Sequence, residues 1–338
     1  MARKFEKHTG IQSRRISQVD EVELATQAIN QLLGEQSITL DRCAAILLVT
    51  PSSIPAGTAN RFLPRDRARE EQPTRMARHL ADRLGMPGIK TYGMNGFCSG
   101  YAKALQFVRR KLRDSWQLPS EKYILVVTSN CISRITNFED RASGALFGDF
   151  ATATMITSCN SASIPPQFEL VDARYERQES ARSYFDFTNT TDVLYPSSDG
   201  GKTRAASRVV FSLDGMGIAD TAPRAMANAA TKMAAENDID PSEVRHIVPH
   251  QAGAAIVRLT GMKLEEAGFT AEPCNGFTRD VGNTSSGSVP FALSELWDKL
   301  QGDILCPVAA VGAPGKPEVS QGCILLRRIQ VGSIRKAA

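Results

Sequence analysis

The sequence lacks the long apolar runs, paired cysteines and leader segment that would place it in several large protein classes. No stretch approaches the ~20 apolar residues of a membrane span, and the amino terminus, MARKFEKHTG, has no apolar signal-peptide core. The seven cysteines are an odd number, widely spaced, with no CxxC pair and no Cys/His pair at metal-ligand spacing. We therefore expect reduced thiols, no metal and a soluble cytoplasmic protein.

An excess of one charge is also absent. The formal net charge is +4 and the isoelectric point about 8.7, with lysines and arginines interspersed among acids. This balance does not indicate a nucleic-acid partner. What the chain does have is length and apolar content: 338 residues that are 42% hydrophobic can bury a large core, as one domain or as two fused halves.

Short apolar runs alternate with segments that carry apolar residues at helical spacing, which predicts an α/β protein. The clearest predicted strands are residues 44–50, 123–129 and 151–157. A polar middle segment, about 177–206, is predicted to be irregular, and the pattern resumes after it. We therefore predict two α/β halves, residues 1–176 and 177–338.

One insertion, residues 61–75, is dense in charge and proline. A solvated loop followed by a helix start accounts for this composition. A lid or docking surface beside an active site is the alternative.

A cysteine lies where a strand is predicted to give way to a helix, in MNGFCSGYAKAL (94–105). If the helix begins near Phe97, the Cys98 thiol lies at its positive end, where free N–H groups stabilise a thiolate. Cys98 is thus a candidate nucleophile, and a structural cysteine at a turn is the alternative.

Two further polar residues precede predicted helices in the second half. His250 follows a strand in RHIVPHQAGAAIV, and Asn283 lies in DVGNTSSGSVPFAL. Functional groups of open α/β sheets gather at the carboxyl ends of strands, so His250 and Cys98 would occupy equivalent places in the two halves. Taken alone, His250 could be a hydrogen-bonded turn residue and Asn283 a turn or capping residue.

Three motifs, taken in order, resemble the nucleophile, histidine and asparagine motifs of the β-ketoacyl-acyl-carrier-protein synthase III group of the thiolase superfamily: NGFCSG, VPHQAG and GNTSSGSVP. HTGIQSRRI (8–16) resembles the early TGI segment of that family. SRITNFEDRASGALFGDFATA resembles the stretch that ends in its FGDGAGA motif. The resemblance spans nearly the whole chain.

The resemblance implies a five-layered αβαβα fold of two similar halves, usually a homodimer, and a two-stage reaction without metal or redox cofactor. Cys98 would take an acyl group from a CoA or carrier-protein thioester, with backbone N–H groups holding the oxyanion. A malonyl thioester would then lose CO₂ and attack the acyl-cysteine, while His250 and Asn283 donate hydrogen bonds to the enolate oxygen. Aspartate or serine in place of Asn283 would be typical of relatives that acylate oxygen or nitrogen.

The chain departs from the family pattern at its amino terminus. Only MARKFEKH precedes Thr9, so the resemblance implies that the first strand of the fold is missing, from near the centre of the first sheet. Lys4 and His8 stand where the family has its adenine-stacking aromatic residue and an arginine, while the arginine partner is kept as Arg141. Binding of CoA is therefore in question.

Other departures concern the second half. Ala255 replaces the basic residue of the family's carrier-protein site, so docking through that helix would rest on Arg258 or Lys263. The closing loop is VGAPGKPEVSQG, in which the N–H of Ala313 is the expected second oxyanion donor. In FGDF, Phe150 replaces a glycine.

These features predict a condensing enzyme of fatty acid or specialised lipid or polyketide biosynthesis, with acyl carrier protein as a partner. Acyl transfer to oxygen or nitrogen, or condensation without decarboxylation, is the alternative on the same fold. A non-catalytic partner subunit is a third reading, and the complete Cys, His and Asn set argues against it.

Overall fold

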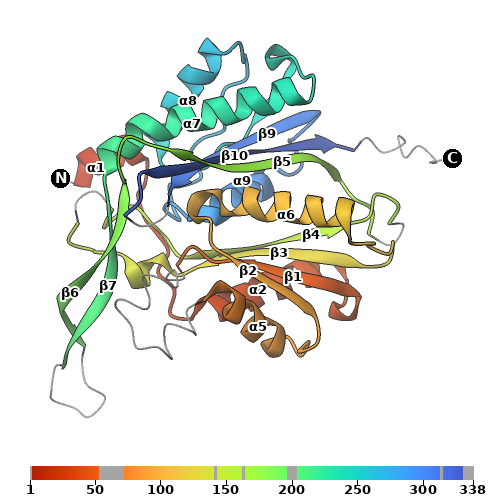
Figure 1. Cartoon of the computed structure of the whole chain (residues 1–338), viewed down its shortest axis with the longest axis horizontal. Helices are drawn as coiled ribbons and strands as arrows, with labels where there is room; N and C mark the ends of the chain where they lie inside the picture. The colour runs from red at the N-terminus through yellow and green to blue at the C-terminus, as the bar shows by residue number, and fades with distance from the viewer. Residues whose placement is uncertain are drawn as a thin grey trace.

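Two four-stranded sheets form the frame of the protein, seen in a computed structural model that describes residues 2–52, 72–140, 143–161, 164–195, 204–312 and 315–329 (Figure 1). The first sheet has the order β2-β1-β3-β4 and the second the order β5-β10-β9-β8. The strands of the first are β1 (Cys43–Val49), β2 (Lys90–Met94), β3 (Tyr123–Asn130) and β4 (Phe150–Thr157). Those of the second are β5 (Phe168–Glu179), β8 (His246–Ile247), β9 (Asp303–Val311) and β10 (Glu318–Arg328).

The strands agree with the apolar runs of the sequence because helices cover both faces of each sheet. All side chains of β3 are buried, and a continuous apolar run, without alternation, is typical of a strand buried on two faces. Along β1, Leu47 faces the core between the sheets, whereas Ile46 faces the helices outside. The three strands predicted at 44–50, 123–129 and 151–157 are confirmed to within one residue.

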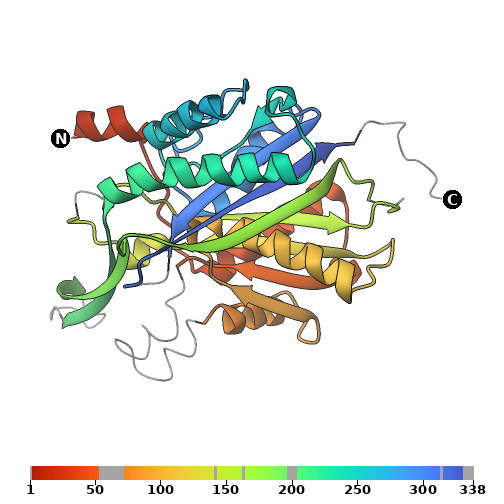
Figure 2. The ribbon, with the colours of Figure 1, turned by 45° about the horizontal axis from the view of Figure 1, so that its top comes forward.

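The helices complete five layers (Figure 1). Between the sheets lie α6 (Gly100–Asp114) and α9 (Ser288–Leu296), outside the first sheet α2 (Glu21–Gln36) and α5 (Pro73–Arg83), and outside the second α7 (Gly215–Glu236) and α8 (Ala254–Glu266). Figure 2 shows α7 lying across the outer face of the second sheet, with α1 (Ala2–Thr9) at the end of α8. The αβαβα fold is therefore confirmed. None of the described helices is long and apolar enough to cross a membrane.

The middle segment, 177–206, was predicted to be irregular, and this is wrong. The strand β5 continues to Glu179, and β6 (Phe185–Tyr195) and β7 (Arg204–Leu213) form an antiparallel hairpin that projects from the body (Figure 1). The signal was the alternation of Phe185 and Phe187, whose buried rings pack together beside Ile132 and Ile135. The predicted boundary at 176/177 falls inside β5, which belongs to the second sheet.

The expected gap near the centre of the first sheet is wrong as well. The strands β1 and β3 pair directly and in parallel, from Cys43 with Tyr123 to Val49 with Thr128. In the second sheet β5 pairs with the outer edge of β10. The corresponding outer edge of the first sheet is that of β4, and no strand pairs with it among the described residues.

Candidate active site

The nucleophile candidate lies in a tight turn between β2 and α6. The Phe97 N–H donates to Oδ1 of Asn95 at 2.9 Å, and the Ser99 N–H donates to the Gly96 carbonyl at 3.0 Å. These bonds form a short 3₁₀ turn, η2 (Phe97–Ser99), in which Phe97 has a φ of +45°. Cys98 therefore stands two residues before α6, at the start of the helix as predicted, and the backbone N–H groups at such a helix start have no partner within the helix.

The asparagine candidate lies in a turn of the same construction in the second half. The Ser285 N–H donates to Oδ1 of Asn283 at 2.8 Å, and the Gly287 N–H donates to the Thr284 carbonyl at 3.0 Å. This turn, η5 (Ser285–Gly287), has Ser285 at a φ of +51° and leads directly into α9. The two halves thus present Asn95 and Asn283 at matching positions, and Ser286 takes the place of Cys98.

Hydrogen bonds from η5 and the start of α9 reach all three predicted catalytic residues. The hydroxyl of Ser285 lies 3.6 Å from Sγ of Cys98, while its N–H holds Asn283. Three residues later, Oγ of Ser288 lies 2.6 Å from Nδ1 of His250. The structure therefore brings Cys98, His250 and Asn283 together around one turn.

His250 is a neutral side chain, and its hydrogen bonds indicate which ring nitrogen carries the proton. It is 2% exposed, and this burial lowers its pKa to about 3. Oγ of Ser288 also accepts the Gln251 N–H at 3.3 Å. The network is satisfied when the Ser288 hydroxyl donates to Nδ1, which puts the ring proton on Nε2. His250 can then act as a neutral hydrogen-bond donor.

The ionisation state of Cys98 differs from the thiolate that its position at the helix start predicted. Burial raises the pKa of its thiol to about 11, whereas the hydrogen bond from Ser285 and the backbone of Cys98 itself lower it. Burial is the largest of these influences, so the resting side chain is a thiol near neutral pH.

Asn283 is held from the first half of the chain. Its N–H donates to the Leu146 carbonyl at 2.9 Å, and its carbonyl accepts the Gly148 N–H at 3.1 Å. Since Oδ1 accepts from Ser285, the amide orientation is fixed and Nδ2 carries the hydrogens. Nδ2 makes no hydrogen bond to any residue that the structure describes, so it is available to a substrate.

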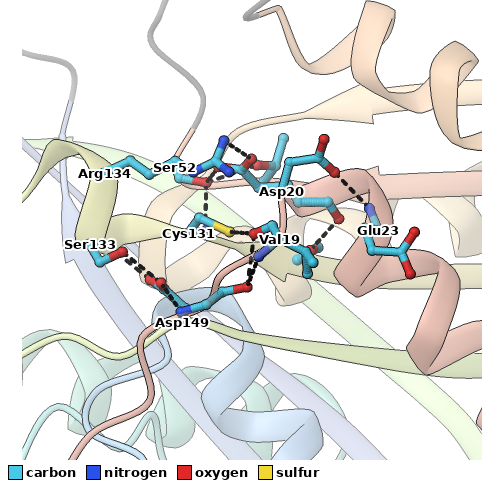
Figure 3. A network of polar contacts seen from close by, with 12 residues as sticks. Val19, Asp20, Glu23, Ser52, Cys131, Ser133, Arg134 and Asp149 are labelled. Atoms are coloured by element: carbon cyan, nitrogen blue, oxygen red, sulfur yellow. Dashed lines mark hydrogen bonds and ion pairs between the residues drawn. The ribbon is translucent and has the colours of Figure 1, made fainter. Parts of the chain in front are cut away.

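The FGDF segment is anchored by a buried carboxylate. Asp149 is 3% exposed and accepts hydrogen bonds from the N–H of Ser17, the N–H of Ser133 and the Ser133 hydroxyl, at 2.6–2.9 Å (Figure 3). Behind it, the Cys131 N–H donates to the Ser52 hydroxyl at 3.0 Å. Asp149 therefore fixes the loop that in turn holds Asn283.

The remaining predicted site residues are placed as follows. Arg141, Ala313 and residues 61–71 lie outside the described residues. Arg258 is exposed on α8. Ser285 and Ser288 were not predicted from the sequence; both belong to the GNTSSGSVP stretch, and the signal was the density of hydroxyl side chains around Asn283. The described residues contain no cluster of three or more His, Cys, Asp or Glu side chains placed to hold a metal.

Comparisons with protein families and curated proteins all match acyl-carrier-protein synthases. A model of 3-oxoacyl-[acyl-carrier-protein] synthase III matches residues 92–169, and a model of the C-terminal part of that family matches 234–314. The chain is 24% identical to β-ketoacyl-[acyl-carrier-protein] synthase III of Campylobacter curvus, covering 65% of this chain and 61% of that protein. It is 28% identical to 3-oxopimeloyl-[acyl-carrier-protein] synthase of Brucella abortus, covering 86% and 79%.

Solved structures share the fold. The 3-oxoacyl-[acyl-carrier-protein] synthase III of Aquifex aeolicus aligns with a TM-score of 0.66 at 22% identity, covering 96% of this chain and 90% of that one. The priming β-ketosynthase of the R1128 polyketide pathway aligns with a TM-score of 0.66 at 20% identity, covering 97% and 89%. The two family matches include Cys98 in the first and both His250 and Asn283 in the second.

Proposed function

Because the chain belongs to the β-ketoacyl-acyl-carrier-protein synthase III-like enzymes of the thiolase superfamily, we propose that it joins an acyl group to a malonyl thioester by decarboxylative condensation. The observation that supports this most directly is the shared turn: Cys98, Asn283 and, through Ser288, His250 are all positioned by η5 and the start of α9. The proposed reaction needs a nucleophile and two donors, and these are the groups that the turn assembles.

The first stage is acyl transfer to Cys98. The thiol gives up its proton as Sγ forms a bond to the thioester carbonyl carbon, the bond from that carbon to the leaving sulfur breaks, and the leaving thiolate takes up a proton. The oxyanion of the tetrahedral intermediate is held by backbone donors, one of them the N–H of Cys98. An acyl-enzyme and a free CoA or carrier thiol result.

The second stage forms the carbon–carbon bond. The malonyl thioester loses CO₂, and the electron pair of the broken bond makes an enolate whose oxygen receives hydrogen bonds from Nε2 of His250 and Nδ2 of Asn283. The enolate carbon attacks the acyl carbonyl, Cys98 leaves as a thiolate, and this thiolate takes up a proton from solvent. Preorganised neutral donors suit an oxygen on which negative charge develops.

The neutral state of His250 favours this reaction over its alternatives. Acyl transfer to a hydroxyl or amine, and condensation without decarboxylation, both need a base to remove a proton from the acceptor. A histidine whose pKa burial lowers to about 3 is a weak base. Decarboxylation produces the carbanion without proton abstraction, so this site can support it with hydrogen-bond donors alone.

We expect Asn283→Ala and Asn283→Asp to separate the two stages. Both variants lose the Nδ2 donor, but the aspartate keeps an oxygen that can accept the Ser285 N–H and preserve the turn. Acyl transfer to Cys98 should survive, visible as a mass gain on the intact protein. Release of CO₂ should fall on the order of 100- to 1,000-fold, the usual effect of removing one oxyanion donor.

Asn275→Ala is the matched control, because Asn275 is exposed and also accepts a hydrogen bond within a turn. If Asn283→Asp condensed at the wild-type rate, Asn283 would serve the turn and not the enolate, and the decarboxylative assignment would be lost. Equal loss of both stages, with an altered circular dichroism spectrum, would identify Asn283 as a folding residue.

An acyl carrier protein is the proposed carrier of at least one substrate, since the matched family and both curated relatives are named for such thioesters. The helix α8 begins four residues after His250 and exposes Arg258, Leu259 and Met262. A basic and apolar helix face is suited to an acidic partner with an apolar contact. The homodimer, the cytoplasmic location and the lack of a cofactor stay predictions.

A further inference from the structure

The side chain in contact with the reacting sulfur is a hydroxyl of the second half. Oγ of Ser285 lies 3.6 Å from Sγ of Cys98, within hydrogen-bonding range for sulfur. Ser285 stands where the first half has Phe97, at nearly the same φ, +51° against +45°. A non-glycine residue in this region is conformationally costly, and this conformation puts Ser285 at the sulfur.

We propose that Ser285 is a further catalytic residue, whose hydroxyl donates a hydrogen bond to the Cys98 thiolate when that thiolate forms. This inference rests on the proposed role of Cys98 as nucleophile. The thiolate forms twice in each cycle, on attack at the acyl thioester and on release of the condensed product. A donor already in place lowers the free energy of the thiolate without a charged neighbour.

In the part of the chain that the structure describes, the charged side chains near Cys98 do not replace Ser285 as the group that stabilises the thiolate. The elements packed against η2 are α6, η5, β9 and β10. Lys103 of α6 donates to the Asn95 carbonyl, and Glu318 of β10 pairs with Arg177. The other titratable side chains of these elements are Tyr101, Arg109, Arg110, Lys111, Arg113, Asp114, Asp303, Cys306, Cys323, Arg327 and Arg328. None of them contributes to the pKa of Cys98, and His250 is neutral.

The neighbouring serine provides a matched control. Ser286 is also buried, and its Oγ has no hydrogen-bond partner among the described residues. Its Cβ packs near Gly100 at the start of α6. Ser285→Ala and Ser286→Ala therefore remove the same atom from adjacent buried positions, and the hydroxyl of Ser285 is the one in contact with Cys98.

The measurement is the rate of alkylation of Cys98 by iodoacetamide in the full chain between pH 7 and 10, followed by peptide mapping. Exposed Cys159 in the same molecule is the internal reference. Ser285→Ala should slow labelling of Cys98 about three- to tenfold relative to Cys159 and move its pH profile upward. The range reflects a hydrogen bond to a charged acceptor, partly offset by the higher nucleophilicity of a more basic thiolate.

Ser285→Gly separates the hydroxyl from the backbone. Glycine accepts the positive φ without strain, so this variant loses the hydroxyl while relaxing the turn. Both Ser285 variants should slow Cys98 labelling alike, whereas Ser286→Ala should leave it unchanged. Acylation of Cys98 by an acyl thioester should slow in the same two variants.

Three outcomes would overturn the proposal. Labelling could be unchanged in both Ser285 variants, or accelerated, which would mean that the thiol donates to Ser285. Ser286→Ala could also slow labelling as much as Ser285→Ala, which would make the effect one of packing. Failure of the proposed function is distinguishable, because alkylation needs no thioester and that failure would appear as no acyl-enzyme in the unaltered protein.

Discussion

At the scale of single residues, the site depends on groups kept uncharged by burial. Burial raises the pKa of Cys98 to about 11 and lowers the pKa of His250 to about 3, and it is the largest cause of both shifts. Each shift favours the neutral form. A site of neutral groups lets the charge that develops on a substrate oxygen attract the donors without competition from a resident ion.

The buried His250 should make the protein less stable in mild acid. In the unfolded chain it titrates near its usual pKa of about 6.5, whereas the folded value is about 3. The unfolded state therefore binds the proton first, so stability is complete above about pH 6.5 and is lost as the pH falls toward 3. Between pH 7 and 5 the loss from this residue is about 2 kcal/mol.

His250→Gln should remove that part of the acid sensitivity. Urea unfolding at pH 7 and pH 5 measures it, and the difference between the two pH values should be smaller in the variant by about the same amount. His79→Gln on α5 is the control substitution. An equal loss of stability in the wild type and in His250→Gln would show that His250 is protonated in the folded protein.

The three catalytic candidates could be identified from sequence because each lies in a short motif next to a predicted strand or helix. The contacts that set the pKa values and orientations of these residues could not be identified from sequence. Ser285 is 187 residues from Cys98, and no local pattern connects the two. The raised pKa of Cys98 could not be predicted either, because the helix start is visible in NGFCSG but the burial that raises the pKa is not.

At the scale of elements, the loop around FGDF is fitted closely to the loop that bears Asn283. A Cβ on Gly148 would lie 1.8 Å from the Val281 carbonyl oxygen, a backbone atom that cannot rotate away. The Gly148 N–H also donates to the Asn283 carbonyl. Glycine is needed here for close approach of two backbones, and not for a positive φ.

Gly148→Ala should therefore displace the Asn283 loop. We expect a loss of roughly 1–3 kcal/mol in the free energy of unfolding, as for overpacked cores, and a larger loss of condensation than of acyl transfer. Gly88→Ala is the matched control, because no atom lies within 4 Å of its added Cβ. Unchanged condensation in Gly148→Ala would mean that this loop does not position Asn283.

Elements were predicted well where both faces of a strand are buried and less well where only one is. The runs that became β1 and β3 are continuous and apolar. The hairpin of β6 and β7 was missed because polar residues interrupt its apolar positions, and its buried rings, such as Phe185, gain their partners from distant segments. The pairing of β1 with β3 was also unavailable from sequence, since register depends on neighbours in space.

At the scale of the whole molecule, α8 connects the site to the surface. Its amino end follows His250, and its outer side exposes Leu259 and Met262, 42% and 58% accessible, beside Arg258. Lys263, the other predicted docking residue, is paired with Glu266 at 2.6 Å. Arg258 is therefore the stronger candidate for contact with an acidic carrier protein.

Charge reversal at Arg258 should raise the KM for an acyl carrier protein substrate several-fold, with little effect on the turnover of a small acyl thioester. The effect should shrink as salt is added, because exposed charges are screened. Arg224→Glu on α7 is the control, as Arg224 is exposed and paired with Asp220. Equal KM values for Arg258→Glu and the wild type would exclude this face as the docking surface.

In the duplicated turn, the backbone provides the same frame in both halves, and the side chains provide the different chemical groups. Each half supplies the same frame, in which an asparagine ties down the residue two places later and a helix follows. One frame carries a nucleophile at its fourth position, and the other carries an amide donor at its first. The reactive side chain can thus change while the backbone of the turn stays the same. A thiol introduced by Ser286→Cys would therefore occupy the position that corresponds to the nucleophile in the first half.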